Sequence, residues 1–98
     1  MVEQRKGRRF QLRLPIELVR IGSLPIRRSA ETRNLSSSGV LFASESKLPI
    51  GEAIEYVITL PVEPVGEQAV RLRCVGKVVR HEASASAATL ERYEFLRN

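Results

Sequence analysis

Two groups of polar residues near the start of this sequence carry side chains suited to binding chemistry. The first group is basic and consists of Arg5, Arg8, Arg9 and Arg13. The second is the continuous run Asn34-Leu35-Ser36-Ser37-Ser38-Gly39. Guanidinium groups bind phosphates and the edges of bases, whereas amide and hydroxyl groups form fixed hydrogen bonds with polar ligands. Together the two groups predict a site for a small polar ligand with an anionic part.

The polar run lies at a strand junction. Asn34 and Ser36 are two residues apart, so on an extended backbone their side chains point the same way. Gly39 ends the run at a point where the chain must turn or a ligand must approach bare backbone. The apolar residues 40–43 that follow predict a buried strand. An ordinary turn is the alternative interpretation, because Asn, Ser and Gly favour turns for local reasons.

The basic charge is concentrated in the first third of the chain. Residues 1–33 contain nine Lys or Arg and three Glu, whereas residues 34–98 contain seven Lys or Arg and eight Glu. Such clustering indicates an anionic partner that meets the N-terminal segment. A solubilising tail is the alternative, since charged runs are often only solvated.

The composition excludes several classes of protein. No stretch approaches the roughly 18 apolar residues of a membrane span, so we expect no membrane partner. The N-terminus lacks the apolar core of a secretory signal, which favours the cytoplasm. The single cysteine, Cys74, cannot form an internal disulfide and is expected in the core. Because no catalytic triad, carboxylate pair or metal-ligand cluster is visible, we expect no enzymatic activity, no metal and no cofactor.

Alternating apolar residues predict about six short strands and no amphipathic helix. The expected strands cover residues 12–18, 28–35, 40–43, 54–60, 70–78 and 90–96. The Ala- and Ser-rich residues 83–88 are expected to form a loop, and the aromatic side chains of Phe10, Phe42, Tyr56, Tyr93 and Phe95 are expected in the core. We therefore predict an all-β fold in which residues 9–98 form one small barrel, because closure removes exposed strand edges. Residues 1–8 are expected to form a flexible basic arm.

The two polar groups also resemble the motifs of a known family. Arg9-Phe10-Gln11-Leu12-Arg13 resembles the RxxxR motif of PilZ domains, and residues 34–39 resemble their (D/N)xSxxG motif. Twenty residues separate the two motifs, a spacing similar to that of the family. Residues 48–52 and 76–80 resemble a later turn and strand of PilZ domains, so the resemblance covers nearly the whole chain.

The resemblance implies a six-stranded antiparallel β-barrel that binds the bacterial second messenger cyclic di-GMP. It implies that Arg9 and Arg13 bind guanine and phosphate. It also implies that Asn34 and Ser36 complete a polar cradle, which Gly39 shapes. The arginine motif would close over the ligand, and this change would be read by a downstream effector protein that the sequence does not identify.

Arg8 directly precedes the first motif. In the family, an arginine at this position tends to accompany binding of a stacked cyclic di-GMP dimer. The resemblance therefore implies a stacked dimer as ligand, with Arg5 as an extra contact.

Two other functions stay open at this point. One is a PilZ-like protein-interaction module without ligand binding, although such domains typically lack the arginines. The other is a basic barrel that binds nucleic acid. Nucleic acid is the less favoured partner, because aromatic residues make up only 5% of the chain and mostly follow the inward pattern.

Overall fold

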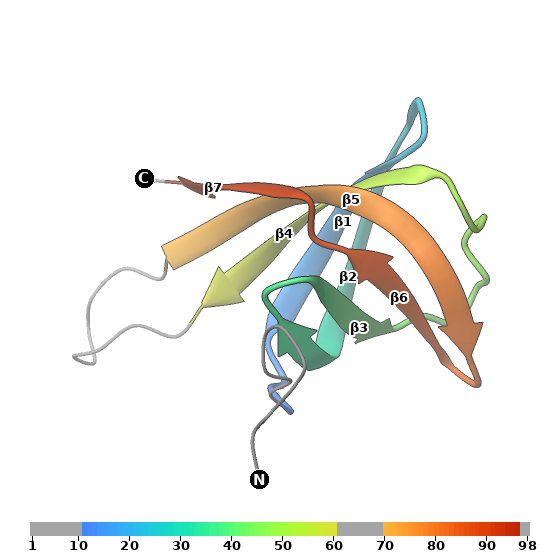
Figure 1. The fold of residues 1–98 in the computed structure, drawn as a ribbon, viewed down its shortest axis with the longest axis horizontal. Coiled ribbons are helices and arrows are strands. Elements are labelled where there is room, and N and C mark those ends of the chain that lie inside the picture. Colours follow the sequence, from blue (N-terminus) through green and yellow to red (C-terminus); the bar gives the residue numbers. More distant parts are fainter. Residues whose placement is uncertain (1–10, 61–69, 97–98) are drawn as a thin grey trace, which may run out of the picture.

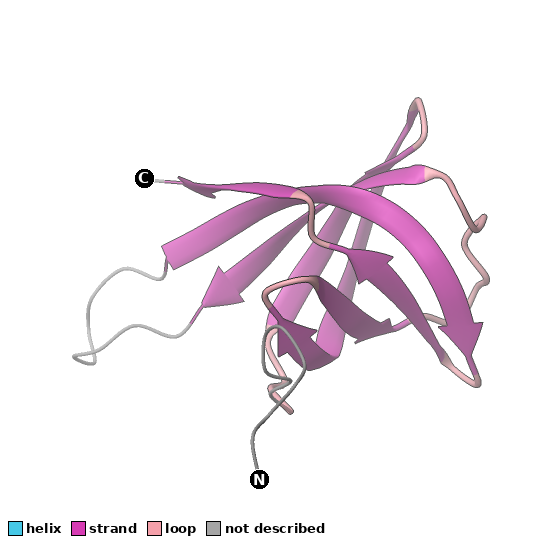
Figure 2. Ribbon diagram, viewed as in Figure 1, coloured by secondary structure: helices cyan, strands magenta, loops and turns pink. Residues whose placement is uncertain are grey.

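The computed structural model describes residues 11–60 and 70–96, in which every regular element is a β-strand (Figure 2). The strands are β1 (Pro15–Ile21), β2 (Leu24–Ser36), β3 (Gly39–Ala43), β4 (Ala53–Leu60), β5 (Val70–Glu82), β6 (Ala85–Thr89) and β7 (Arg92–Leu96). The expected arm at residues 1–8, Arg9 and Phe10 lie outside the described residues.

Six of these strands form a closed antiparallel barrel, as predicted. The strand order is β4-β1-β2-β3-β6-β5, and β5 pairs back onto β4 to complete the ring (Figure 1). The strands β2 and β5, each of 13 residues, are long enough to pair with different neighbours along their length. The first part of β2 pairs with β1 and its end with β3, while β5 passes from β4 to β6 in the same way.

The predicted alternation is confirmed in the barrel core. In β1, for example, Ile16 and Leu18 point inward and are almost fully buried. The remaining large apolar side chains of the core are Leu14, Ile21, Val40, Phe42, Leu48, Ile54, Tyr56, Ile58, Leu72, Cys74 and Val78. Full burial of the Cys74 thiol raises its pKa to about 11, so this side chain is an inert part of the core.

The prediction of a loop at residues 83–88 is wrong. Only Ala83 and Ser84 form a turn, and Ala85 begins the strand β6, which is the sixth strand of the barrel. Alanine and serine have little intrinsic preference for strands. They are accommodated here because β6 lies between β3 and β5, where Ala85, Ser86 and Ala88 are at most 3% exposed.

The prediction that Tyr93 and Phe95 point into the core is also wrong, because each is 61% exposed. They pair with Cys74 and Leu72 of β5 and therefore share the face of those core residues. However, β7 pairs only with β5 and extends the sheet beyond the closed barrel, so no described element covers this face. Leu12 is likewise 40% exposed, since regular pairing of the first strand begins only at Pro15.

A series of ion pairs crosses four strands on the outer surface of the barrel. Glu55 of β4 accepts hydrogen bonds from Arg20 of β1 and from Arg73 of β5, and Arg73 also lies 3.5 Å from Glu94 of β7. Glu55 is only 6% exposed. The hydrogen bonds from Arg73 and then Arg20 lower the pKa of its carboxyl group below the ordinary value.

We predict that Glu55→Gln lowers the free energy of unfolding by about 2 kcal/mol at neutral pH, because charge-assisted hydrogen bonds to both arginines are lost. The pKa of Glu55 is lower in the folded chain than in the unfolded chain, where it is near 4.5. Glu55 therefore stabilises the folded state fully at a pH above its unfolded pKa, and this stabilisation is lost as the pH falls through its folded pKa. Urea unfolding at several pH values should therefore show the difference from the parent chain shrinking in acid. Glu45→Gln, at an exposed loop residue, is the control. An equal difference at all pH values would contradict the assignment.

Candidate ligand-binding site

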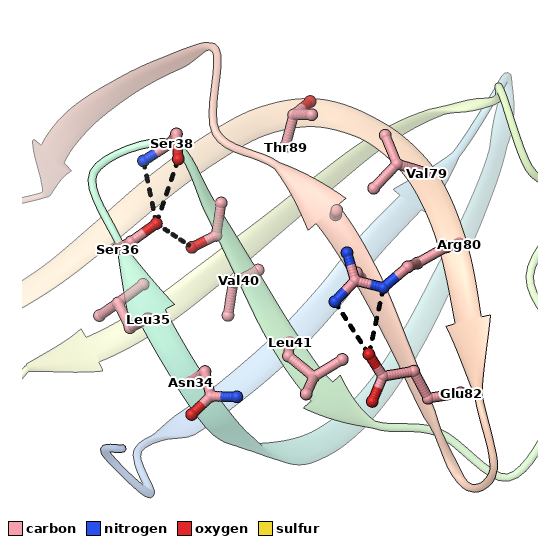
Figure 3. Close-up of a pocket in the computed structure, with 13 residues that line it drawn as sticks. Asn34, Leu35, Ser36, Ser38, Val40, Leu41, Val79, Arg80, Glu82 and Thr89 are labelled. Atoms are coloured by element: carbon pink, nitrogen blue, oxygen red, sulfur yellow. Dashed lines mark hydrogen bonds and ion pairs between the residues drawn. The ribbon is translucent and has the colours of Figure 1, made fainter. Parts of the chain in front are cut away.

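A groove of about 280 Å³ opens on the outer surface of the barrel, across β2, β3, β6 and the end of β5 (Figure 3). Asn34 and Ser36 line it from β2, and Arg80 and Glu82 line it from β5. Between these two walls, β3 and β6 contribute Gly39, Leu41, Ala87 and Thr89. The groove thus has polar walls on two strands and a floor of mainly small residues.

A β-bulge directs Asn34 and Ser36 toward the groove. Thr32 pairs with Phe42, and both side chains are fully buried. The register then shifts by one residue at Arg33, so that Asn34 pairs with Leu41. An extra residue reverses the alternation of side chains along β2. Asn34 therefore points to the outside of the barrel, whereas Thr32 points to the inside.

A second bulge places Arg80 on the same outer face. Val78 of β5 pairs with the buried Ala88, and the register shifts at Val79 so that Arg80 pairs with Ala87. Because Ala87 also pairs with Leu41, and Leu41 with Asn34, these four residues form one row across the four strands. Asn34 and Arg80 therefore stand at opposite ends of the same row, on the two walls of the groove (Figure 3).

Arg80 is a charged residue of the groove wall that faces Asn34, and sequence reasoning did not identify it. Its guanidinium donates two hydrogen bonds to Oε2 of Glu82, from Nε at 3.1 Å and from Nη2 at 2.8 Å (Figure 3). The pair is about half exposed. Strict alternation from Val78 would point Arg80 inward, so the side-chain pattern argued against a place in the groove. The one indication in the sequence was that Arg80 ends residues 76–80, which resemble a later strand of PilZ domains.

Ser36 holds the turn between β2 and β3. Its Oγ accepts a hydrogen bond from the Ser38 amide at 3.2 Å and donates to the Gly39 carbonyl at 3.4 Å. The local turn function that was the alternative interpretation is therefore present, although Ser36 still borders the groove. The side-chain amide of Asn34, by contrast, has no hydrogen-bond partner within residues 11–60 and 70–96 (Figure 3).

Gly39 has a structural role that does not depend on a ligand. It pairs with Thr89, and a Cβ atom at this position would lie 2.7 Å from the backbone oxygen of Ala88. Only glycine allows β3 and β6 to pack this closely without a shift of the backbone. This close contact lies in the floor of the groove, which Gly39, Ala88 and Thr89 line.

The structure places Arg13 beside β2 but not in the lining of the groove. Its side chain is 81% exposed and lies 3.9 Å from Glu31. The neighbouring backbone is fixed by Thr32, whose Oγ1 donates to the Leu12 carbonyl at 2.5 Å and accepts from the Leu14 amide at 2.9 Å. The backbone on both sides of Arg13 is therefore hydrogen-bonded to Thr32 of β2, which lies two residues before Asn34. Arg5, Arg8 and Arg9 lie outside the described residues.

Comparison with known families agrees with this architecture. The family model described as PilZ domain matches residues 3–97, and a search of curated proteins found no match. PilZ domains are receptor domains for cyclic di-GMP and are binding rather than catalytic domains. Within the described part of the chain, no group of His, Cys, Asp or Glu side chains could hold a metal ion, and no helix could cross a membrane.

We predict that Thr32→Val lowers the free energy of unfolding by about 1–3 kcal/mol, because the buried amide of Leu14 loses its acceptor. The substitution keeps the size and shape of the side chain, so little packing is lost. Urea unfolding measures the effect, with Ser29→Ala, which removes an exposed hydroxyl from the same strand, as the control. Equal stability of the Thr32→Val variant and the parent chain would show that this attachment is not needed.

Proposed function

The chain belongs to the PilZ domain family, and on this premise we propose that it is a receptor module for cyclic di-GMP without catalytic activity. The observation that supports the proposal best is the groove itself. It brings Asn34 and Ser36 of the polar motif together on one outer face, opposite a guanidinium group on β5. Cyclic di-GMP presents phosphates and guanine edges, which are the partners that these groups bind well.

The walls of the groove complement the ligand in chemical terms. The Asn34 amide can donate and accept hydrogen bonds and brings no negative charge toward a phosphate. Arg80 can pair with O6 and N7 of guanine through two parallel hydrogen bonds, or neutralise a phosphate. We propose that Asn34 and Ser36 bind one side of the ligand and that Arg80 contacts the other.

The arginine motif supplies the cover in this proposal. The groove opens on the outer surface, and a ligand lying there exposes its outward face unless another segment covers it. The attachment of Leu12 and Leu14 to Thr32 fixes the C-terminal end of the motif beside β2. Arg9 and Arg13 would then bind guanine and phosphate from above.

The remaining arginines extend the same proposal. Arg8 would bind the second molecule of a stacked cyclic di-GMP dimer, and Arg5 would add a further contact. Binding would bring the arginine motif over the groove and change the surface that a separate effector protein meets.

Calorimetric titration of the chain with cyclic di-GMP tests the proposal, with GTP as the control ligand. We expect micromolar or tighter binding, and a loss of about tenfold or more in Arg9→Ala, Asn34→Ala and Ser36→Ala, because each variant loses direct polar contacts. Arg27→Ala removes an exposed arginine from the opposite half of β2 and should bind as the parent chain does.

The stoichiometry separates the two forms of the ligand. About two ligands per chain, with binding of the second lost in Arg8→Ala, would support the stacked dimer. The reason is that the second ligand molecule needs a further guanidinium group, which Arg8 supplies in this proposal. A folded chain that releases no heat and gains no thermal stability with cyclic di-GMP would contradict the receptor function.

Glu82 should oppose binding, since its carboxylate engages Arg80 and places negative charge in the groove. We predict that Glu82→Gln tightens cyclic di-GMP binding by about threefold to tenfold, and that added salt reduces this gain. Arg80→Ala should weaken binding, and Glu45→Gln should leave it unchanged. If Glu82→Gln weakens binding as much as Arg80→Ala, Glu82 positions Arg80 instead of competing for it.

A further inference from the structure

The strand β7 presents a free edge and an uncovered aromatic face. It lies along β5 at the periphery of the molecule (Figure 1), and its other edge meets no strand among the described residues. Tyr93 and Phe95 are each 61% exposed, and their rings form an edge-to-face pair with centroids 6.0 Å apart. A free edge beside exposed aromatic rings is a template for strand pairing, which soluble proteins usually protect.

We propose that a second copy of this chain occupies this edge, with the two β7 strands paired antiparallel about a two-fold axis at Tyr93. Isologous pairing of this kind uses the same surface on both copies and closes after two. It joins the two barrels through one continuous sheet. The proposal concerns a surface that the ligand groove does not use.

The charges on β7 select the position of the axis. With the axis at Tyr93, Arg92 of each copy lies opposite Glu94 of the other, so two opposite-charge pairs form. An axis at Arg92 or at Glu94 would instead place identical charges opposite each other, which is unfavourable across neighbouring strands. Within the described residues, Arg92 has no ion-pair partner in its own chain, so it is available for this contact.

The ion pairs on the barrel surface continue across the proposed axis. Along one chain the signs alternate from Arg20 to Glu55, Arg73 and Glu94, and the series ends at Glu94 on β7. Arg92 of the second copy would be the next neighbour of Glu94 and carries the charge that continues the alternation. Glu94 is 63% exposed on its side chain in the single chain, which leaves it accessible to this additional partner.

The aromatic side chains gain cover in the same arrangement. Tyr93 and Phe95 share one face of β7, so the two Tyr93 rings would meet at the axis, each flanked by its own Phe95. Residues directly opposite each other on antiparallel strands contact closely, and aromatic pairs stabilise such contacts beyond the area that they bury. Because β7 has only five residues, we expect a reversible dimer and not a permanent one.

Sedimentation velocity over micromolar to millimolar concentrations of the chain tests the proposal. The parent chain should convert reversibly from monomer to dimer as its concentration rises. Arg92→Glu and Glu94→Arg each place like charges opposite one another at both pairs, so each variant alone should dimerise about tenfold or more weakly. An equimolar mixture of the two variants restores opposite charges at both pairs and should dimerise again.

Two controls separate this interface from general effects. Thermal unfolding of both variants establishes that they are folded, and the restored dimer in the mixture establishes it independently. Glu45→Arg makes the same charge change as Glu94→Arg on an exposed loop and should dimerise as the parent chain does. A parent chain that stays monomeric, or a mixture that associates no better than the separate variants, would overturn the proposal.

Discussion

Closure of the barrel depends on two long strands that change partners at a bulge. The strand β2 leaves β1 after Glu31 and pairs with β3 from Thr32, with the extra residue Arg33 at that corner. The strand β5 leaves β4 after Lys77 and pairs with β6 from Val78, with the extra residue at Val79. Bulges increase the local bend and twist of a strand, which allows a single strand to serve two parts of a closed sheet.

The same two corners create the groove. Each bulge reverses the alternation of side chains immediately after it, so a polar residue that would have faced the core faces outward instead. Asn34 and Arg80 are the first residues after the two reversals, and the pairing of β3 with β6 holds them at the ends of one row. The geometry that closes the barrel therefore also separates a hydrogen-bonding wall from a cationic wall.

Close backbone packing keeps the corner of β5 in place. A Cβ atom on Gly76 would lie 1.8 Å from the backbone oxygen of Thr89, so no other residue fits there without movement of β6. That oxygen also accepts a hydrogen bond of 2.9 Å from the hydroxyl of the buried Tyr56. Gly76 lies three residues before Val79, the extra residue of the bulge in β5.

The outer surface of the barrel is divided between two kinds of interaction. Where β1, β4, β5 and β7 run together, Glu55 and Arg20, Arg73 and Glu94 form ion pairs across the strands. At the end of β5, the partner that Arg80 has among residues 11–60 and 70–96 is Glu82, on its own strand. A partner two residues away on an exposed face is weakly held, which suits a group that must exchange it for a ligand.

The sequence by itself determined the all-β class of the fold and its barrel, because the two-residue period of apolar side chains marks each strand locally. It identified Phe42 and Tyr56 as core for the same reason. It also determined that Asn34 and Ser36 lie together, because a short polar motif is a local property of the chain. Only the tertiary structure decided that residues 85–89 form a strand, that Tyr93 and Phe95 stay exposed, and that Arg80 joins the groove. These outcomes depend on which neighbour a strand meets and on bulges that shift the register by one residue, and side-chain alternation along a single strand carries no information about either.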